Sequence, residues 1–195
     1  MIELIHLIRH GETEWSRSGR HTGRTDVPLT PHGEQQARHV GELLRATQFS
    51  RVLVSPLQRA RRTCELAGLG AGEVVEPDLR EWDYGEYEGL TRVQIRARCA
   101  DWDVFRDGCP GGETPTQVCV RADAVVAELR AMSGPVAVFS HGHFLRALAV
   151  RWIGQPLVCA RHLGLDAGGL STLGYEHHSL EEPAIELWNA GVVPG

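Results

Sequence analysis

Strand-like apolar segments alternate with helix-forming segments along most of this 195-residue chain, and this alternation constrains its fold more than any other feature. Short apolar runs bounded by polar residues are typical of buried strands. Six such strands are expected, at 5–8, 51–54, 74–75, 135–139, 172–177 and 184–187. Alternating strands and helices build a layered α/β domain with a mostly parallel sheet. We therefore predict one domain over residues 1–195, folded as a three-layer α/β/α sandwich.

Three pairs of a hydroxyl residue and a proline mark expected helix starts. A Ser or Thr at the cap accepts a backbone hydrogen bond, and proline suits the first helical position. The pairs are Thr30-Pro31, Ser55-Pro56 and Thr114-Pro115. The helix after Pro115 should bury one apolar stripe, made by Val118, Ala122, Val125, Leu129 and Met132. A further helix is expected from about residue 143 to residue 152.

The segment 80–112 breaks this pattern, because it is rich in Gly, Asp, Trp and Tyr and has no clear period. It looks too irregular to belong to the core. We expect it to form a flap or lid over the site.

Composition excludes several classes of protein. The net charge of −5 argues against a nucleic-acid-binding protein, which usually carries a basic face. No stretch approaches the ~20 apolar residues of a membrane span, and the first residues lack the pattern of a signal peptide. We therefore expect a cytoplasmic protein with five unpaired cysteines. All 20 basic residues are Arg, whose planar guanidinium suits phosphate.

The most reactive side chains stand at the ends of the expected strands. In open α/β sheets, ligands bind beyond the carboxyl ends of the strands. The segments that stand there are Arg9-His10-Gly11, Ser55-Pro56 with Arg59 nearby, and Ser140-His141-Gly142-His143. Arginines and a helix N-terminus hold an anion, and a neutral histidine can attack phosphorus to give a phosphohistidine. This arrangement favours a phosphate site over a metal site.

Longer motifs follow one another along nearly the whole chain: Arg9-His10-Gly11-Glu12-Thr13, Ser55-Pro56 with Arg59, Leu79-Arg80-Glu81 with Tyr84-Gly85, and Ser140-His141-Gly142-His143. They resemble the histidine phosphatase superfamily, which includes cofactor-dependent phosphoglycerate mutases, so the resemblance implies the phosphoglycerate mutase-like fold. Five segments narrow the match: Thr13-Glu14-Trp15-Ser16, Gly19-Arg20-His21-Thr22-Gly23, Leu79-Arg80-Glu81-Trp82-Asp83-Tyr84-Gly85, Arg106-Asp107-Gly108-Cys109 and Leu165-Asp166-Ala167-Gly168-Gly169. They are similar to the branch of fungal sedoheptulose-1,7-bisphosphatase and small bacterial acid phosphatases.

The resemblance implies a role for each matching residue. His10 would be the nucleophile, and Arg9, Arg59 and His141 would bind the phosphoryl group. Glu81 would be the proton donor and then the base; Trp82 and Tyr84 beside it could desolvate a carboxyl enough to keep its proton, and Asp83 and Glu86 compete for the role. We expect further contacts with substrate or phosphate from Ser16, Thr22, Gly23, Tyr84, Gly142, His143 and Arg146.

Several of these assignments stay open. Ser16 stands where the family often has Asn, and a hydroxyl can still donate to phosphate. His143 either contacts substrate or only packs, and Arg146 either binds a second anionic group or forms a surface salt bridge. The rest of the substrate could be contacted by Arg20, His21, Tyr84, Arg106 and Arg146.

The expected function is therefore a phosphomonoesterase of the acid phosphatase type. It would act on small phosphorylated metabolites without a metal or cofactor, and best below neutral pH. The alternatives are a cofactor-dependent phosphoglycerate mutase and a sugar-bisphosphate-specific phosphatase. A binding module without catalysis is disfavoured, because all five matching catalytic residues are present. Glu81 and His141 lie only 60 positions apart, too few for the lid that shields a mutase phosphoenzyme from water. The last two strands could supply an edge for a homodimer.

Overall fold

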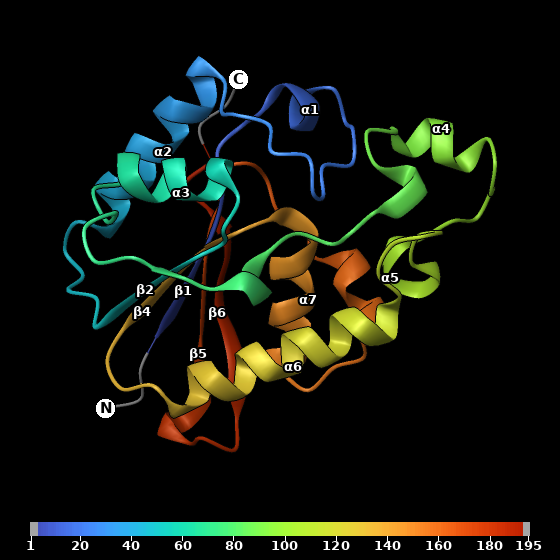
Figure 1. Ribbon diagram of the computed structural model, residues 1–195. Helices are drawn as coiled ribbons and strands as arrows, with labels where there is room; N and C mark the ends of the chain where they lie inside the picture. The colour runs from blue at the N-terminus through green and yellow to red at the C-terminus, as the bar shows by residue number, and fades with distance from the viewer. Residues whose placement is uncertain (1–3, 193–195) are drawn as a thin grey trace.

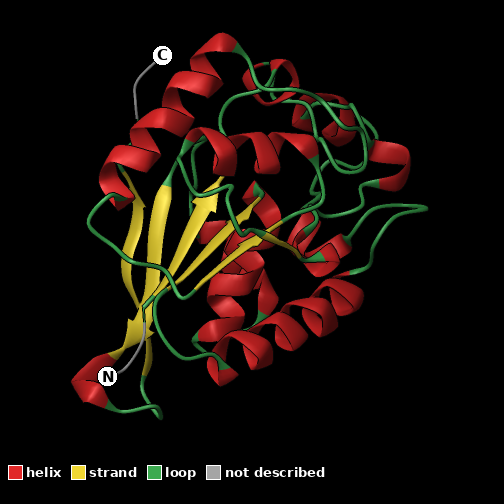
Figure 2. Ribbon diagram, turned by 60° about the vertical axis from the view of Figure 1, so that its left-hand side comes forward, coloured by secondary structure: helices red, strands yellow, loops and turns green. Residues whose placement is uncertain are grey.

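A six-stranded mixed sheet lies at the centre of the computed structural model, which describes residues 4–192 (Figures 1 and 2). Four neighbouring strands are parallel, and the last two add to the sheet in antiparallel orientation, in the order β3-β2-β4-β1-β5-β6. The strands are β1 (Ile5–Arg9), β2 (Arg51–Val54), β3 (Val74–Val75), β4 (Val136–Ser140), β5 (Leu170–Tyr175) and β6 (Pro183–Ala190). The predicted mostly parallel sheet is confirmed.

Helices cover both faces of the sheet, as expected for three layers. Figure 1 shows α2 and α3 on one face and α6 and α7 on the other. The helices are α1 (Glu14–Arg17), α2 (Pro31–Leu44), α3 (Gln58–Leu66), α4 (Arg92–Arg96), α5 (Val104–Asp107), α6 (Pro115–Ala131) and α7 (Gly142–Trp152). Short 3₁₀ turns lie at η1 (Pro77–Leu79), η2 (Gly85–Tyr87), η3 (Leu157–His162) and η4 (Glu176–His178). None of the helices within residues 4–192 is long and apolar enough to cross a membrane.

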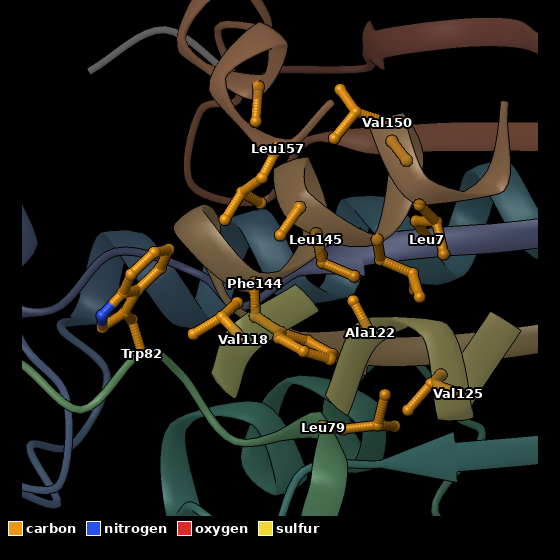
Figure 3. Packing of buried hydrophobic residues seen from close by; sticks show 14 of the residues in the cluster. Leu7, Leu79, Trp82, Val118, Ala122, Val125, Phe144, Leu145, Val150 and Leu157 are labelled. Atoms are coloured by element: carbon orange, nitrogen blue, oxygen red, sulfur yellow. The ribbon is translucent and has the colours of Figure 1, made fainter. Parts of the chain in front are cut away.

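Alternate residues of the central strands pack into two hydrophobic clusters, one on each face of the sheet. Leu7 and Val138 point into the larger cluster with α6 and α7, whereas Ile8 and Phe139 point toward α2 and α3. This alternation is the period of two that a strand imposes on its side chains. Figure 3 shows the larger cluster, in which Leu7 packs with side chains of both helices. The sheet is therefore buried on both faces, and its strand ends are held rigidly.

Two details of the predicted helices are wrong. Thr30 and Thr114 cap their helices as expected, but α3 begins at Gln58, and no side chain caps it. Ser55 is not a cap, because its hydroxyl lies 2.7 Å from Nε2 of His141. Met132 follows α6 in an extended conformation, with ψ of 154°, instead of extending its apolar stripe.

The segment 80–112 is irregular, but the expectation that it lies outside the core is wrong. Trp82, Tyr84, Trp102 and Phe105 are buried in the larger hydrophobic cluster. Trp82 stands at one end of the cluster in Figure 3. Aromatic side chains bury large areas without a regular backbone, and this is why composition misled the prediction. The role of the segment as a flap stays a prediction.

The last part of the chain also departs from the expectation in detail. β5 begins at Leu170 and ends at Tyr175, so His177 lies in a 3₁₀ turn with φ of 50° and not in a strand. β6 forms one edge of the sheet.

Candidate active site

Parallel pairing of β1 with β4 brings the two motif histidines together. Arg9 lies opposite Ser140 in the register, so His10 and His141 leave neighbouring strands at the same edge. Their ring centroids are 5.1 Å apart. A Cβ atom on Gly11 would lie 2.2 Å from the carbonyl oxygen of Gly33, so only glycine allows α2 to approach the strand end this closely.

The His10 ring is held in one tautomer. Its Nδ1 lies 2.7 Å from the carbonyl oxygen of Gly11, which can only accept a hydrogen bond, so Nδ1 carries the proton. The side chain is 4 % exposed. Burial lowers the pKa of His10 well below its usual value, and the Arg59 and Arg9 guanidinium groups lower it further. His10 is therefore neutral at neutral pH, with a lone pair on Nε2.

Arg59 and His141 form a buried layer behind His10. Nε of Arg59 donates to Nδ1 of His141 over 3.1 Å, so the Nε2 hydrogen of His141 points at the Ser55 hydroxyl. Both side chains have no exposed surface. Burial, with Arg59 next in importance, lowers the pKa of His141 well below its usual value. We name this set of His10, Arg59 and His141 the buried floor.

The Arg59 guanidinium also holds a loop of the cleft. It donates to the carbonyl oxygens of Thr22, Gly23 and Thr25, each over 3.0 Å. Glu88 holds the same loop from outside, because its carboxylate accepts the N–H groups of Gly23 and Thr25. The Gly23 N–H is therefore already bonded, although we expected it to contact substrate. Nothing in the sequence near Glu88 marks this role.

Arg9 presents a buried donor that lacks a partner within residues 4–192. Its Nε is buried and makes no hydrogen bond there, while its Nη1 donates to the carbonyl oxygen of Leu165. A Cβ atom on Gly142 would lie 3.3 Å from the guanidinium, so this glycine keeps the space open. A buried unpaired donor is costly and calls for an acceptor. A phosphoryl oxygen would satisfy it.

Glu81 reaches the N-terminus of α7 from the irregular segment. One carboxylate oxygen accepts the N–H groups of Trp82 and Phe144 over 2.9 Å, and the other accepts that of His143 over 3.0 Å. It is 7 % exposed. We expected Trp82 and Tyr84 simply to desolvate this carboxyl, but the Trp82 backbone also bonds to it.

Tyr84 and His143 form one wall of the cleft. The Tyr84 hydroxyl lies 2.5 Å from Nδ1 of His143. Burial raises the pKa of Tyr84 well above its usual value, so the hydroxyl keeps its proton and can donate a hydrogen bond to the ring nitrogen. The His143 ring stacks on His21, with centroids 5.8 Å apart and planes 6° apart. His143 thus both packs and faces the cleft.

A cleft of about 180 Å³ opens above these residues. Most predicted site residues line it, together with Arg20 and His21: they are Arg9, His10, Ser16, Thr22, Glu81, Tyr84, Gly142, His143 and Arg146. Arg59 and His141 lie beneath it and do not line it. The Ser16 hydroxyl donates to the carbonyl oxygen of Thr13, so it is engaged in the cap of α1. Arg106 is wrong as a candidate, because it is exposed, pairs with Asp107 and lines no part of the cleft.

Other reactive groups give no competing centre. Within residues 4–192, no group of three or more His, Cys, Asp or Glu side chains is arranged to hold a metal ion. Burial raises the pKa of Cys109 to about 12, and burial likewise raises that of Cys64. These two thiols are therefore not thiolate nucleophiles at neutral pH.

Comparison with known proteins agrees with this geometry. The sequence model of the histidine phosphatase superfamily (branch 1) matches residues 5–191. An acid phosphatase of Mycobacterium tuberculosis is 46 % identical over 175 residues, which cover 88 % of this chain and 86 % of the relative. Sedoheptulose 1,7-bisphosphatase of Saccharomyces cerevisiae is 36 % identical over an alignment of 252 positions, which covers 96 % of this chain and 93 % of the relative.

A solved structure shows the same fold. The product of the open reading frame Rv3214 of Mycobacterium tuberculosis superposes with a TM-score of 0.90 at 42 % identity, covering 96 % of this chain and 97 % of that one. The chain therefore belongs to the histidine phosphatase superfamily. It is an enzyme of the phosphatase class, as its motifs predicted.

Proposed function

We propose that this protein is a phosphomonoesterase that hydrolyses small phosphorylated metabolites through a phosphohistidine on Nε2 of His10, without a metal ion or organic cofactor. One observation carries the proposal. A neutral, buried His10 offers its Nε2 lone pair in a cleft where the Arg9 Nε is an unpaired donor within residues 4–192. The nucleophile His10 and an anion-binding group, the Arg9 guanidinium, thus lie in the same cleft.

Two steps account for hydrolysis. In the first, Nε2 of His10 bonds to phosphorus while the bond from phosphorus to the ester oxygen breaks, and Glu81 gives its proton to that oxygen. In the second, the Glu81 carboxylate takes a proton from water as the water oxygen bonds to phosphorus and the N–P bond breaks.

Hydrolysis is favoured over transfer to a second metabolite. The cleft is open to water, and water reacts with a phosphohistidine that it can reach. The two curated relatives described above are named as phosphatases. A mutase would interconvert the monophosphoglycerates and be stimulated by the bisphosphate, so we expect no such stimulation here.

Trapping the phosphoenzyme tests the mechanism. The enzyme is mixed with p-nitrophenyl phosphate, quenched in alkali after milliseconds and digested for mass spectrometry. We expect phosphate on the peptide that contains His10, and we expect both the label and turnover to vanish in His10→Ala, with a rate loss of at least about 10³-fold. His39→Ala, on the outer surface of α2, is the matched control and should retain both. Label on another residue, or full turnover in His10→Ala, would reject the proposal, and a loss of activity in EDTA would reject metal independence.

A further inference from the structure

The edge strand β6 contains a β-bulge near its C-terminal end. Its pairing with β5 is irregular between Leu170 and Thr172. At this point two residues of β6, Trp188 and Asn189, lie opposite one residue of β5, Ser171. Asn189 has a φ of 55°, in the left-handed region that Asn tolerates better than most residues. Bulges redirect side chains and are often found beside active sites. The bulge therefore points to a use for these two side chains beyond packing of the sheet.

Both bulged side chains bind the loop of residues 163–169, which leads into β5. Oδ1 of Asn189 accepts the Asp166 N–H, and Nδ2 of Asn189 donates to the Asp166 carboxylate, each over 2.8 Å. Nε1 of Trp188 donates to the carbonyl oxygen of Gly164. The backbone of the bulge is fixed as well, because the Asn189 N–H donates to the buried Ser171 hydroxyl over 3.0 Å. We call these contacts of Asn189 and Trp188 with the loop the bulge clamp.

Two glycines of the loop connect the clamp to the end of β1. A Cβ atom on Gly169 would lie 2.5 Å from Oδ1 of Asn189, so a larger residue there would displace the amide. The carbonyl oxygen of Gly169 accepts the Arg9 N–H over 3.1 Å. The Gly168 N–H donates to the carbonyl oxygen of His10, also over 3.1 Å. The clamped loop is therefore bonded directly to the two residues that begin the site.

The same loop holds the Arg9 guanidinium. The carbonyl oxygen of Leu165 accepts Nη1 of Arg9, and Leu165 lines the cleft and is 7 % exposed. Leu165 directly precedes Asp166, the residue that Asn189 binds. Because a guanidinium is planar, the bond at Nη1 also fixes the direction of the Nε–H, the buried donor that has no partner within residues 4–192. The position of the loop thus decides where this donor points.

We propose that Asn189 is a positioning residue for Arg9: it holds the 163–169 loop so that the Arg9 Nε–H meets a phosphoryl oxygen. This inference rests on the proposed function. Asn189 does not line the cleft and acts through Leu165. Asp166 is exposed, so each hydrogen bond of the clamp contributes little to stability by itself. The expected effect is geometric, since a misplacement of about 1 Å can cost ~10²-fold in a reaction.

Binding of orthovanadate, which mimics the phosphoryl group during transfer, tests the clamp by calorimetry. Asn189→Gly leaves the φ of 55° accessible but removes the amide, and it should weaken vanadate binding about 10-fold. Asp166→Ala removes one of the two side-chain bonds and should weaken it about 3-fold. Asp166→Asn keeps an acceptor for the Asn189 amide and should stay within about 2-fold of the unchanged protein. Glu186→Gln, an exposed side chain of the same strand, is the control and should have no effect.

A double-mutant cycle with Arg9 separates positioning from general damage. In Arg9→Gln no guanidinium is left to position, so adding Asn189→Gly should weaken vanadate by less than about 2-fold. A 10-fold loss in both backgrounds, no loss in either, or equal losses in Asp166→Asn and Asp166→Ala would overturn the inference. Thermal melting shows which variants are folded, and the variants of the exposed Asp166 test the clamp even where Asn189→Gly does not fold. Absence of a phosphohistidine in the unchanged protein would instead overturn the proposed function, and the vanadate cycle would still decide the role of Asn189.

Discussion

The buried floor of the cleft differs in construction from an outer pocket of about 340 Å³, which shares His21, His143 and Arg146 with the cleft. In the floor, His10 and His141 leave the ends of central strands and Arg59 lies in α3. All three are almost fully buried, and Arg59 donates a hydrogen bond to His141. The outer pocket has a buried wall that includes Trp102 and Phe105. At its mouth, Arg92, Arg161 and His162 come from the short helices α4 and η3 and are exposed. The difference shows how one scaffold can keep its chemistry while the substrate changes: surface side chains can be replaced at little cost in stability, whereas floor side chains cannot.

Glu81 lines the catalytic cleft, and its replacement should give a large effect. Glu81→Gln keeps the shape but cannot give a proton, so esters with poor leaving groups should lose about 10²–10⁴-fold in kcat. The loss should be much smaller for p-nitrophenyl phosphate, whose leaving group needs no proton. Steady-state rates with aryl and alkyl phosphates measure this difference.

The control is Glu86→Gln, an exposed carboxyl of the same segment that we weighed as a competing acid. It should leave the ratio of the two rates unchanged. Equal losses for both leaving groups in Glu81→Gln would mean that the residue positions substrate and gives no proton.

A buried ion pair, Arg121 with Glu113, holds the backbone that carries Glu81. Arg121 of α6 is 6 % exposed and donates to the carbonyl oxygens of Asp78 and Arg80 over 2.8 and 2.7 Å. It also pairs with Glu113 over 2.8 Å, and Glu113 accepts the Asp83 N–H. The backbone is therefore held on both sides of Glu81. We infer that Arg121 is a positioning residue for the proton donor.

Arg121→Met should lower kcat about 10-fold for alkyl phosphates and less for p-nitrophenyl phosphate, a weaker form of the Glu81 effect. A structural defect alone would lower both rates alike. Arg121→Lys, which keeps the charge but not the fork of donors, should recover part of the loss. Replacement of the exposed Arg24, which pairs with Asp83 at the surface, is the control and should change the ratio little.

The same contrast explains what the sequence could predict. Motifs at strand ends predicted that Arg9, His10 and His141 lie together, and the motif that follows β2 predicted the same for Arg59 in α3. The contacts of Arg121 and Glu88 were missed, because their partners lie far away in the chain and meet only after folding. Ser55 was misread as a helix cap, since its partner His141 lies 86 positions away. Local pattern thus predicts which residues form the floor, whereas tertiary packing decides how they are supported.

Acid should lower the free energy of unfolding through the two floor histidines, and this is the smallest of the expected effects. Burial lowers the pKa of His10 and His141 below the ~6.5 of the unfolded chain. The unfolded state then binds more protons below pH 6.5, so stability is full above that pH and is lost as pH falls toward the folded values. Each histidine adds a slope of up to about 1.4 kcal/mol per pH unit.

Chemical denaturation between pH 7.5 and 5 measures this slope. His10→Asn removes one titrating floor group and should reduce the slope by up to about 1.4 kcal/mol per pH unit. A slope that is the same in the variant and in the unchanged protein would show that His10 is protonated as easily in the folded chain as in the unfolded one. It would also remove the argument that the floor holds its nucleophile neutral, so this measurement links the stability of the floor to its chemistry.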